Sequence, residues 1–289
     1  MQEFDFVRPG NLEELMTALR QGGGRIIAGG TDVIPKLRRD QLSASRLIDI
    51  SALEDLRVIA QEGDWISIGA LITHRQILQA PLLQVHNPAL VAAVASIGCD
   101  QTRNRGTLGG NIANASPAGD TIPPLLVFDA EVALNGPEGR RTFPLEGFIT
   151  GPGETQMQAH EFIHSLRFRP LSGAWGAAFE KLGKRSGMAI SVANAAAAVV
   201  LDSRGRVEQA RLALGSVAPV ALRCAEAEAF LSGKTPTQET LQEAASLCAS
   251  GISPISDVRA TADYRRYAAV VLARRALQAA VDSARRSVP

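Results

Sequence analysis

The chain has 289 residues, enough for two domains with a sizeable buried core. Hydrophobic residues make up 46% of it and charged residues 20%, the ordinary balance of a globular protein. A formal net charge of +1 excludes any argument from composition for nucleic acid or an anionic membrane as partner. No apolar run approaches the length of a membrane span, and the first ten residues lack the layout of a signal peptide.

The cysteines and histidines predict no metal site on this chain. Three widely spaced cysteines argue against a disulfide framework and against an iron–sulfur or zinc site: Cys99, Cys224 and Cys248. The four histidines show no metal-ligand spacing: His74, His86, His160 and His164. We expect at least three of them to be structural or solvated, and we expect a cytoplasmic protein, the default compartment for free cysteines.

Residues 1–55 are predicted to form a small α/β layer. Asn11 is suited to cap a helix over residues 12–21, and three glycines then end that helix. Asp32 is placed to cap a short helix over residues 33–39. Two short apolar runs, residues 25–28 and 46–50, are typical of strands.

Residues 56–172 are predicted to form a second subdomain that contains two hairpins. Alternating apolar residues flank turn residues 62–64 in the first hairpin, and residues 136–139 turn the second. Asp120 is expected to cap a helix, because the prolines at 123 and 124 fit only early in a helix. The other predicted elements are helices from Thr73 and from Asn87 and a strand over residues 161–169.

Between two apolar segments lies the stretch TRNRGTLGGNIANASPAGD, residues 102–120. It has four glycines and no apolar period, so we predict a loop that is neither a strand nor an amphipathic helix. A loop of that length inside a compact domain is either functional or disordered, and its apolar flanks argue against disorder.

Residues 173–289 are predicted to form an α+β domain, because strands come first and helices follow. The strands are expected over residues 174–182, 189–201 and 207–214, and the helices over residues 221–231, 237–249 and 261–286.

A first glycine turn, Gly29-Gly30-Thr31-Asp32, follows directly on the strand at residues 25–28. Glycines let several N–H groups converge on one point and let a pyrophosphate approach the backbone. A plain strand-to-helix turn explains Gly29 and Gly30 about equally well. Gly30 stands where a Walker A loop needs lysine, and the Rossmann G-x-G-x-x-G spacing is absent.

Together, the two glycine-rich stretches predict a cradle for a large phosphorylated ligand, which we interpret as FAD. They supply backbone donors without concentrating positive charge, which suits a chain with no basic excess. Asp120 is placed to accept from a ribose or ribityl hydroxyl, although helix capping explains it equally well.

The motifs also carry a family resemblance over nearly the whole chain. They are Phe4-Asp5-Phe6, Ala28-Gly29-Gly30-Thr31-Asp32, Ile68-Gly69-Ala70, Gly106-Thr107-Leu108-Gly109-Gly110-Asn111, Ser116-Pro117-Ala118-Gly119-Asp120, Asp257-Val258-Arg259 and Tyr264-Arg265. In these motifs the chain resembles the medium, FAD-binding subunit of the molybdenum hydroxylases, the xanthine dehydrogenase and carbon monoxide dehydrogenase family.

The resemblance implies an α+β fold: a p-cresol methylhydroxylase-type FAD domain over residues 1–172, with subdomains of about 1–55 and 56–172, and a small α+β domain over 173–289. It places the FAD pyrophosphate on Ile26, Ile27, Ala28, Gly29, Gly30, Thr31, Asp32, Val33, Thr107, Gly109, Gly110 and Asn111. It places Ile97 in apolar contact with the cofactor, Asp120 on the FAD chain, and Lys181 and Ile190 beside the isoalloxazine ring. Ala189-Ile190-Ser191 departs from relatives that carry an acid-Ile-Ala pattern there.

By the resemblance, the chain is the electron-transfer flavoprotein of an oxidoreductase complex with non-covalent FAD. An iron–sulfur small subunit would supply two [2Fe–2S] clusters and a large subunit the molybdenum cofactor, in a dimer of heterotrimers. Electrons would leave for NAD, oxygen or another acceptor. Because the flavin carries the chemistry, no catalytic residue is assigned. Two alternatives stay open: a stand-alone FAD-dependent oxidoreductase of the same fold, and a flavin-free assembly subunit.

Overall fold

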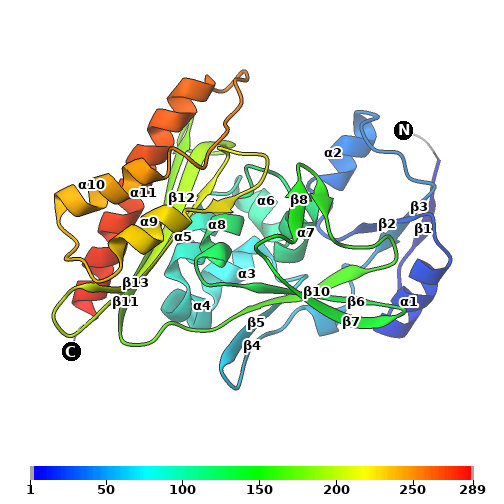
Figure 1. Cartoon of the computed structure of the whole chain (residues 1–289). Coiled ribbons are helices and arrows are strands. Elements are labelled where there is room, and N and C mark those ends of the chain that lie inside the picture. Colours follow the sequence, from blue (N-terminus) through cyan, green and yellow to red (C-terminus); the bar gives the residue numbers. More distant parts are fainter. Residues whose placement is uncertain (1–2, 288–289) are drawn as a thin grey trace.

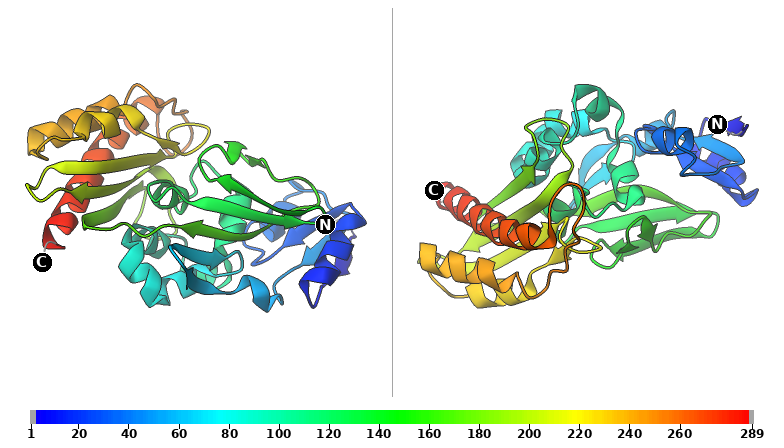
Figure 2. Two further views of the ribbon diagram at one scale, coloured as in Figure 1. Left: turned by 60° about the horizontal axis from the view of Figure 1, so that its bottom comes forward. Right: turned by 90° about the horizontal axis from the view of Figure 1, so that it is seen from above.

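The computed structural model describes residues 3–287 and shows three units, each built on its own sheet (Figure 1). The first and the last unit lie at opposite ends of the molecule, and the second unit lies between them (Figure 2). Helices and strands both contribute throughout, so the predicted α+β class is confirmed. The predicted domain boundary at residue 172 stays a prediction. No helix among residues 3–287 is both long and apolar enough to cross a membrane.

The first unit is a parallel sheet in the order β1-β3-β2. Its elements are β1 (Asp5–Val7), α1 (Leu12–Arg20), β2 (Gly24–Ile27), α2 (Val33–Arg38) and β3 (Arg46–Asp49). Asn11 caps α1 as predicted, because its side chain accepts from the N–H of Glu14 at 2.9 Å. The predicted side-chain cap by Asp32 is wrong. Its carboxylate accepts instead from Nδ2 of Asn114 at 3.4 Å, a distant partner that no local pattern reveals.

The second unit is an antiparallel sheet in the order β4-β5-β10-β6-β7, and both predicted hairpins are confirmed. Its strands are β4 (Ile59–Glu62), β5 (Trp65–Gly69), β6 (Glu131–Gly136), β7 (Gly139–Pro144) and β10 (Phe162–Phe168), with the small pair β8 (Ile149–Gly151) and β9 (Glu154–Thr155). Its helices are the short 3-10 turn η1 (Glu54–Leu56), α3 (His74–Gln79), α4 (Pro81–His86), α5 (Pro88–Ala95), α6 (Asp100–Arg105), α7 (Leu108–Asn114) and α8 (Ile122–Leu126).

The prediction of an irregular loop over residues 102–120 is wrong, because α6 and α7 occupy much of it. Thr107 caps α7 by accepting from the N–H of Gly110 at 3.1 Å. Leu108 and Ile112 lie one turn apart on α7 and are fully buried. A capping hydroxyl and one buried apolar pair are therefore enough to form two helical turns despite the two glycines.

The third unit is an antiparallel sheet in the order β11-β12-β13-β14, with the helices α9 to α11 on its outer face (Figure 1). The three predicted strands and the last two predicted helices are confirmed with small shifts at their ends. The helix predicted over residues 221–231 begins only at Ala225, because residues 222–223 form the short strand β14. The elements are β11 (Ala174–Gly183), β12 (Ser191–Leu201), β13 (Val207–Gly215), β14 (Leu222–Arg223), α9 (Ala225–Leu231), α10 (Gln238–Leu247) and α11 (Ala262–Arg286).

Strand β12 joins the third unit to the second, because it is buried on both faces along its whole length. Ala195 and Ala197 belong to the core formed with α11, whereas Ala196 and Ala198 belong to the core of the second unit. This alternation follows from the two-residue period of a strand. Asn194 shares its face with Ala196, so the same period directs a polar side chain toward the second unit.

Candidate functional site

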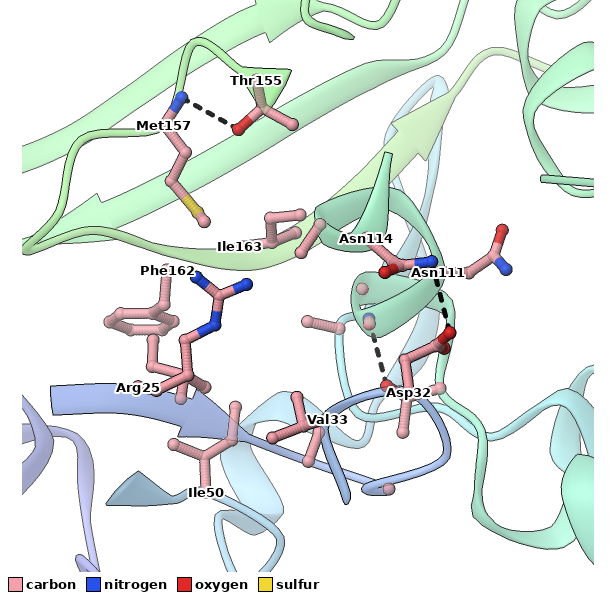
Figure 3. Close-up of a pocket in the computed structure, with 18 of the residues that line it drawn as sticks. Arg25, Asp32, Val33, Ile50, Asn111, Asn114, Thr155, Met157, Phe162 and Ile163 are labelled. Atoms are coloured by element: carbon pink, nitrogen blue, oxygen red, sulfur yellow. Dashed lines mark hydrogen bonds between the residues drawn. The ribbon is translucent and has the colours of Figure 1, made fainter. Parts of the chain in front are cut away.

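A cavity of about 440 Å³ lies between the first and the second unit, within the roughly 300–1,000 Å³ typical of small-molecule sites. Three stretches line it: the first glycine turn, the second glycine turn with α7, and residues 153–163. Figure 3 shows Asp32 and Asn114 at one end of this cavity and Arg25, Met157 and Phe162 at the other. Two turns more than 70 residues apart in sequence therefore face one space.

The first turn presents backbone donors to the cavity. The N–H groups of residues 29–32 donate to no other group among the described residues. Gly30 has a φ of +73°, a left-handed conformation that glycine adopts without strain. Gly29 and Gly30 are half-buried, where N–H groups are almost always hydrogen-bonded in proteins, whereas Thr31 and Asp32 are exposed. The two half-buried free donors therefore indicate a place for an anionic ligand.

The second turn does not present such donors, which corrects the expectation that both turns offer convergent N–H groups. The N–H groups of Leu108 and Gly109 donate to the carbonyls of Ile72 and Ala70. Those of Gly110 and Asn111 donate to Thr107. The second turn is therefore held against the residues that follow β5. It lines the cavity with the backbone of Gly109 and Gly110 and with side chains of α7.

The two turns are in direct contact. A Cβ atom on Gly29 would lie 1.8 Å from the carbonyl oxygen of Arg105, so only glycine allows this approach. Nζ of Lys36 donates to Oδ1 of Asn114 at 2.7 Å, and Asn114 in turn donates to Asp32. These contacts hold the first unit against α7 and set the width of the cavity.

Most of the predicted pyrophosphate residues line this cavity. They are Ile26, Ala28, Gly29, Gly30, Thr31, Asp32, Val33, Thr107, Gly109, Gly110 and Asn111. Ile27 does not, because it packs into the small core beneath α2 with Leu37 and Leu47. The other predicted cofactor residues lie outside the lining of the cavity: Ile97, Asp120, Lys181 and Ile190.

These four residues are associated with a buried polar cluster at the joint between the second and the third unit. Oδ1 of Asp120 accepts from Oγ of Ser191 at 2.5 Å and from Nδ2 of Asn194 at 2.8 Å. Oδ2 accepts from Nζ of Lys181 at 2.6 Å. Lys181 also donates to the carbonyl of Ser96, the neighbour of Ile97, and Ile190 precedes Ser191 and is exposed.

The prediction that Asp120 caps a helix is therefore wrong. Helix α8 has no side-chain cap, and Asp120 is occupied by partners on β11 and β12, 61 to 74 residues away. A buried carboxylate is stable only with such compensation. An ionised carboxylate has about four acceptor positions, so Asp120 keeps room for one more donor.

Sequence reasoning missed several residues of the cavity. Arg25 was predicted only as part of a short apolar strand and Lys36 only as part of a helix capped by Asp32, and residues 153–163 showed no motif. His74 was not singled out among the four histidines, and it both lines the cavity and is buried. Nothing in their local sequence distinguishes them, because only the packing of the first unit on the second brings them to one space.

His74 lies beneath the second glycine turn. Its N–H donates to the carbonyl of Gly106, and its ring contacts Gly106 so closely that a Cβ there would lie 3.0 Å from Cδ2. The side chain is 3% exposed, and Nδ1 has no partner among the described residues. Burial, helped by the positive charge of Arg103, lowers the pKa of His74 to about 4.

We expect His74 to make the stability of the protein depend on pH. The unfolded chain takes up a proton on this residue below pH 6.5, whereas the folded chain does so only near pH 4. The free energy of unfolding should therefore fall by about 1.4 kcal/mol per pH unit as the pH is lowered through this interval. Urea unfolding at pH 7 and pH 5 measures the slope.

A His74→Gln variant should have a clearly shallower slope than the wild-type chain, and His86→Gln, at a partly exposed site, should keep the wild-type slope. An unchanged slope in His74→Gln would show that this histidine is not the titrating group. The comparison of slopes remains valid even where the variant is less stable at pH 7.

The site fits FAD on three structural grounds. The free N–H groups of the first turn suit a pyrophosphate. At Gly29 a Cβ would clash with the backbone of Arg105, so the backbone of the first turn lies bare of side chains where the two turns meet. The cavity has a volume of about 440 Å³, with Asp32 and Asn114 on one side and Arg25, Phe162 and Met157 on the other (Figure 3).

Comparisons with known proteins agree with this fit. Residues 2–170 match the family described as the FAD binding domain in molybdopterin dehydrogenase. Residues 177–280 match the CO dehydrogenase flavoprotein C-terminal domain. The resemblance stated from the motifs and the FAD cofactor are thereby confirmed.

Individual relatives align over nearly the whole chain. The carbon monoxide dehydrogenase medium chain of Hydrogenophaga pseudoflava is 35% identical over 280 residues, which is 96% of each chain. A putative xanthine dehydrogenase FAD-binding subunit of Escherichia coli is 33% identical over 90% of this chain and 89% of its own. A solved structure of the H. pseudoflava carbon monoxide dehydrogenase superposes with a TM-score of 0.94 at 34% identity and covers 98% of both chains. The chain therefore belongs to the FAD-binding flavoprotein family of the molybdopterin dehydrogenases.

Proposed function

We propose that this chain is the electron-transfer flavoprotein of a molybdenum hydroxylase complex. It holds FAD non-covalently in the cavity between its first two units. Bound FAD supplies both one-electron and two-electron redox chemistry, so it connects one-electron iron–sulfur clusters to a two-electron acceptor. The part of this chain would be to hold and orient that flavin between the clusters of a partner subunit and NAD, oxygen or another acceptor.

The observation that carries the proposal is the first glycine turn, whose free N–H groups face a cavity closed by the second turn. The pyrophosphate would lie against residues 29–32, with Thr107 to Asn111 as the opposite wall. The cavity reaches Asn111, whose Oδ1 accepts from Oγ1 of Thr121 at 2.7 Å. Thr121 adjoins Asp120, so the flavin half would extend toward the cluster of Asp120 and Lys181 at the joint with the third unit.

The names of the relatives support partner subunits for this chain. Proteins called medium chains are parts of assemblies with other chains, as in the glyceraldehyde dehydrogenase medium chain of Sulfolobus acidocaldarius. We propose an iron–sulfur small subunit and a molybdenum-binding large subunit, assembled as a dimer of heterotrimers in the cytoplasm. Among the described residues, no group of three or more His, Cys, Asp and Glu side chains is arranged to hold a metal ion.

The test begins with the purified chain. Its visible absorption spectrum, and the flavin released on denaturation, should give about one FAD per chain without a covalent bond. Absence of flavin after incubation with excess FAD would favour the flavin-free assembly subunit.

The source of electrons is tested next, with FAD bound. Purified small subunit, reduced beforehand with its clusters intact, should reduce the flavin, whereas purines, aldehydes and carbon monoxide should not reduce it in the isolated chain. Reduction by a small organic substrate without partners would favour the stand-alone oxidoreductase.

Lys181 should set the potential of the bound flavin. Its ammonium is 10% exposed and neutralises Asp120 at 2.6 Å. A Lys181→Met variant leaves a net negative charge there, which disfavours electron uptake. We expect the midpoint potential of FAD to fall by about 30 mV or more, the equivalent of a tenfold change in a two-electron equilibrium.

Dye-coupled redox titration measures this potential. Lys184→Met is the matched control, because Lys184 is exposed and, within residues 3–287, donates only to the carbonyl of Val258. If both variants and the wild-type chain have equal midpoint potentials, Lys181 does not influence the flavin.

A further inference from the structure

A buried arginine of the third unit lies behind the polar cluster of Asp120. Arg265 is 4% exposed and belongs to the first turn of α11. Strand β12 runs between α11 and the second unit, which carries Asp120 (Figure 1). Among the described residues, Arg265 forms no hydrogen bond with Asp120 or with a side chain that donates to it. Any influence of Arg265 on that cluster must therefore pass through the backbone.

Arg265 holds two backbone segments at once. Nη1 donates to the carbonyl of Val192 at 2.6 Å and to the carbonyl of Ser216 at 3.1 Å. Val192 lies at the start of β12, and Ser216 directly follows the end of β13. Nη2 donates to Asp257 at 2.8 Å and so fixes the plane of the guanidinium. A planar fork can direct such bonds along fixed lines, whereas the ammonium of a lysine is a single point charge.

Each of these two segments reaches Asp120 by a short path. Ser191 adjoins Val192, and its hydroxyl donates to Oδ1 of Asp120 at 2.5 Å. The N–H of Ser216 donates at 2.8 Å to the carbonyl of Pro117, three residues before Asp120. One guanidinium thus fixes both a donor to Asp120 and the turn that carries Asp120.

The backbone of Ser216 is in a conformation that depends on this hold. Its φ is +65°, in the left-handed region that is unfavourable for a residue with a side chain. Its hydroxyl is buried and has no partner among the described residues, so the side chain does not stabilise the turn. The bonds to Arg265 and Pro117 therefore maintain this conformation.

The turn after β13 also touches the second donor to Oδ1 of Asp120. Asn194 donates to that oxygen at 2.8 Å and pairs with Gly215 in the ladder of β12 and β13. A Cβ on Gly215 would lie 2.3 Å from Oδ1 of Asn194, so the two residues are in direct contact. A shift of this turn would displace Asn194 as well.

We propose that Arg265 is a positioning residue for the flavin: it holds Ser191, Asn194 and the turn of Asp120 in the arrangement that sets the potential of bound FAD. The proposal rests on the proposed function, because it takes the flavin half of FAD to lie beside the Asp120 cluster. Without this hold the carboxylate of Asp120 loses hydrogen-bond donors and carries more uncompensated negative charge. That charge disfavours the uptake of electrons by a neighbouring flavin.

The test compares the midpoint potentials of FAD bound to the full chain and to its variants, measured by dye-coupled redox titration. Arg265→Lys keeps the charge but loses the fork. The reduction equilibrium should shift at least about tenfold toward oxidised flavin, a fall of about 30 mV for two electrons. Where this variant does not fold, Asp257→Asn replaces it, because it removes the anchor of the guanidinium, and its potential should fall in the same direction.

Leu241→Ala is the control for loss of stability alone. Leu241 is 1% exposed on α10, in the core between the helices and the sheet of the third unit. Its truncation leaves a cavity there but removes no bond to Val192, Ser216 or Asp257. The flavin potential of this variant should equal that of wild type, and an equal fall in Leu241→Ala and Arg265→Lys would overturn the proposal.

A double-mutant cycle shows whether Arg265 acts through Asp120. Asp120→Asn removes the charge, so adding Arg265→Lys to it should leave the potential unchanged. If Asp120→Asn does not retain FAD, Ser191→Ala is the second background, in which the effect of Arg265→Lys should be clearly smaller than in the wild-type chain. A full effect of Arg265→Lys in the background used would overturn the proposal.

The wild-type chain separates this proposal from the proposed function. Wild type that binds FAD, with the same potential in Arg265→Lys, removes only the positioning role. Wild type that binds no FAD removes the proposed cofactor site and the positioning role with it. Urea unfolding of each variant confirms that the comparison is between folded proteins.

Discussion

Alanine at position 29 is expected to lower the affinity for FAD by at least about a hundredfold, equivalent to roughly 3 kcal/mol. The added Cβ would lie 1.8 Å from the carbonyl oxygen of Arg105 and 2.5 Å from its carbonyl carbon. Both are backbone atoms of the segment before the second turn, so neither can rotate away. The two turns must separate, and the wall of free N–H groups in the first turn then loses its position relative to α7.

The flavin content of the purified chain and the dissociation constant for added FAD measure this effect. Gly110→Ala offers a graded comparison, because its Cβ would meet Oγ1 of Thr107 at 2.8 Å, a side-chain atom that can move. Gly251→Ala is the matched control, since nothing lies within 4 Å of a Cβ there. Full flavin content in Gly29→Ala would show that close contact of the two turns is not needed for binding.

Removing the guanidinium of Arg265 should lower the free energy of unfolding by about 3–5 kcal/mol, the range for breaking a buried ion pair. Arg265 is 4% exposed although it is charged. Nη1 donates to the carbonyls of Val192 and Ser216, at 2.6 and 3.1 Å, and Nη2 donates to Asp257 at 2.8 Å. It therefore joins the start of β12 and the end of β13 to the segment before α11.

Urea unfolding of Arg265→Ala, followed by the fluorescence of the two tryptophans, Trp65 on β5 and Trp175 on β11, measures this loss. Arg259→Ala is the control, because Arg259 also pairs with Asp257 but its side chain is 37% exposed. We expect a loss of about 1 kcal/mol or less there. Equal losses in the two variants would show that burial of Arg265 does not decide its contribution.

The same cluster predicts loss of stability in acid. Burial disfavours the charged form of Asp257, but hydrogen bonds from the N–H of Arg259 and from Arg265 outweigh burial, and the pKa of Asp257 lies well below its usual value. A carboxylate with a lowered pKa stabilises the fold above its unfolded pKa, near 4, and that contribution is lost as the pH falls further. In the Arg265→Ala variant this acid-dependent loss should be smaller than in wild type.

Local chemistry in the sequence was sufficient to determine most of the elements. Asn11 caps α1 within four residues, and the alternating apolar residues of both hairpins need only a strand period. The glycine turns and the C-terminal motifs were likewise sufficient to identify the family, because close backbone approach and left-handed φ values restrict the choice of residue. The second glycine stretch was predicted as a loop because its helix α7 depends on two buried side chains rather than on a period.

Only the tertiary structure decided how the site is assembled. Lys36 donates a hydrogen bond to Asn114, 78 residues away in sequence, and Lys181 donates one to Asp120, 61 residues away. Arg25 and His74 line the cavity although their elements show no binding motif. Such pairings follow from the packing of one unit on another, and no window of local sequence contains both partners. The sequence by itself thus determined which turns suit a phosphorylated ligand, whereas long-range packing determined which side chains surround it.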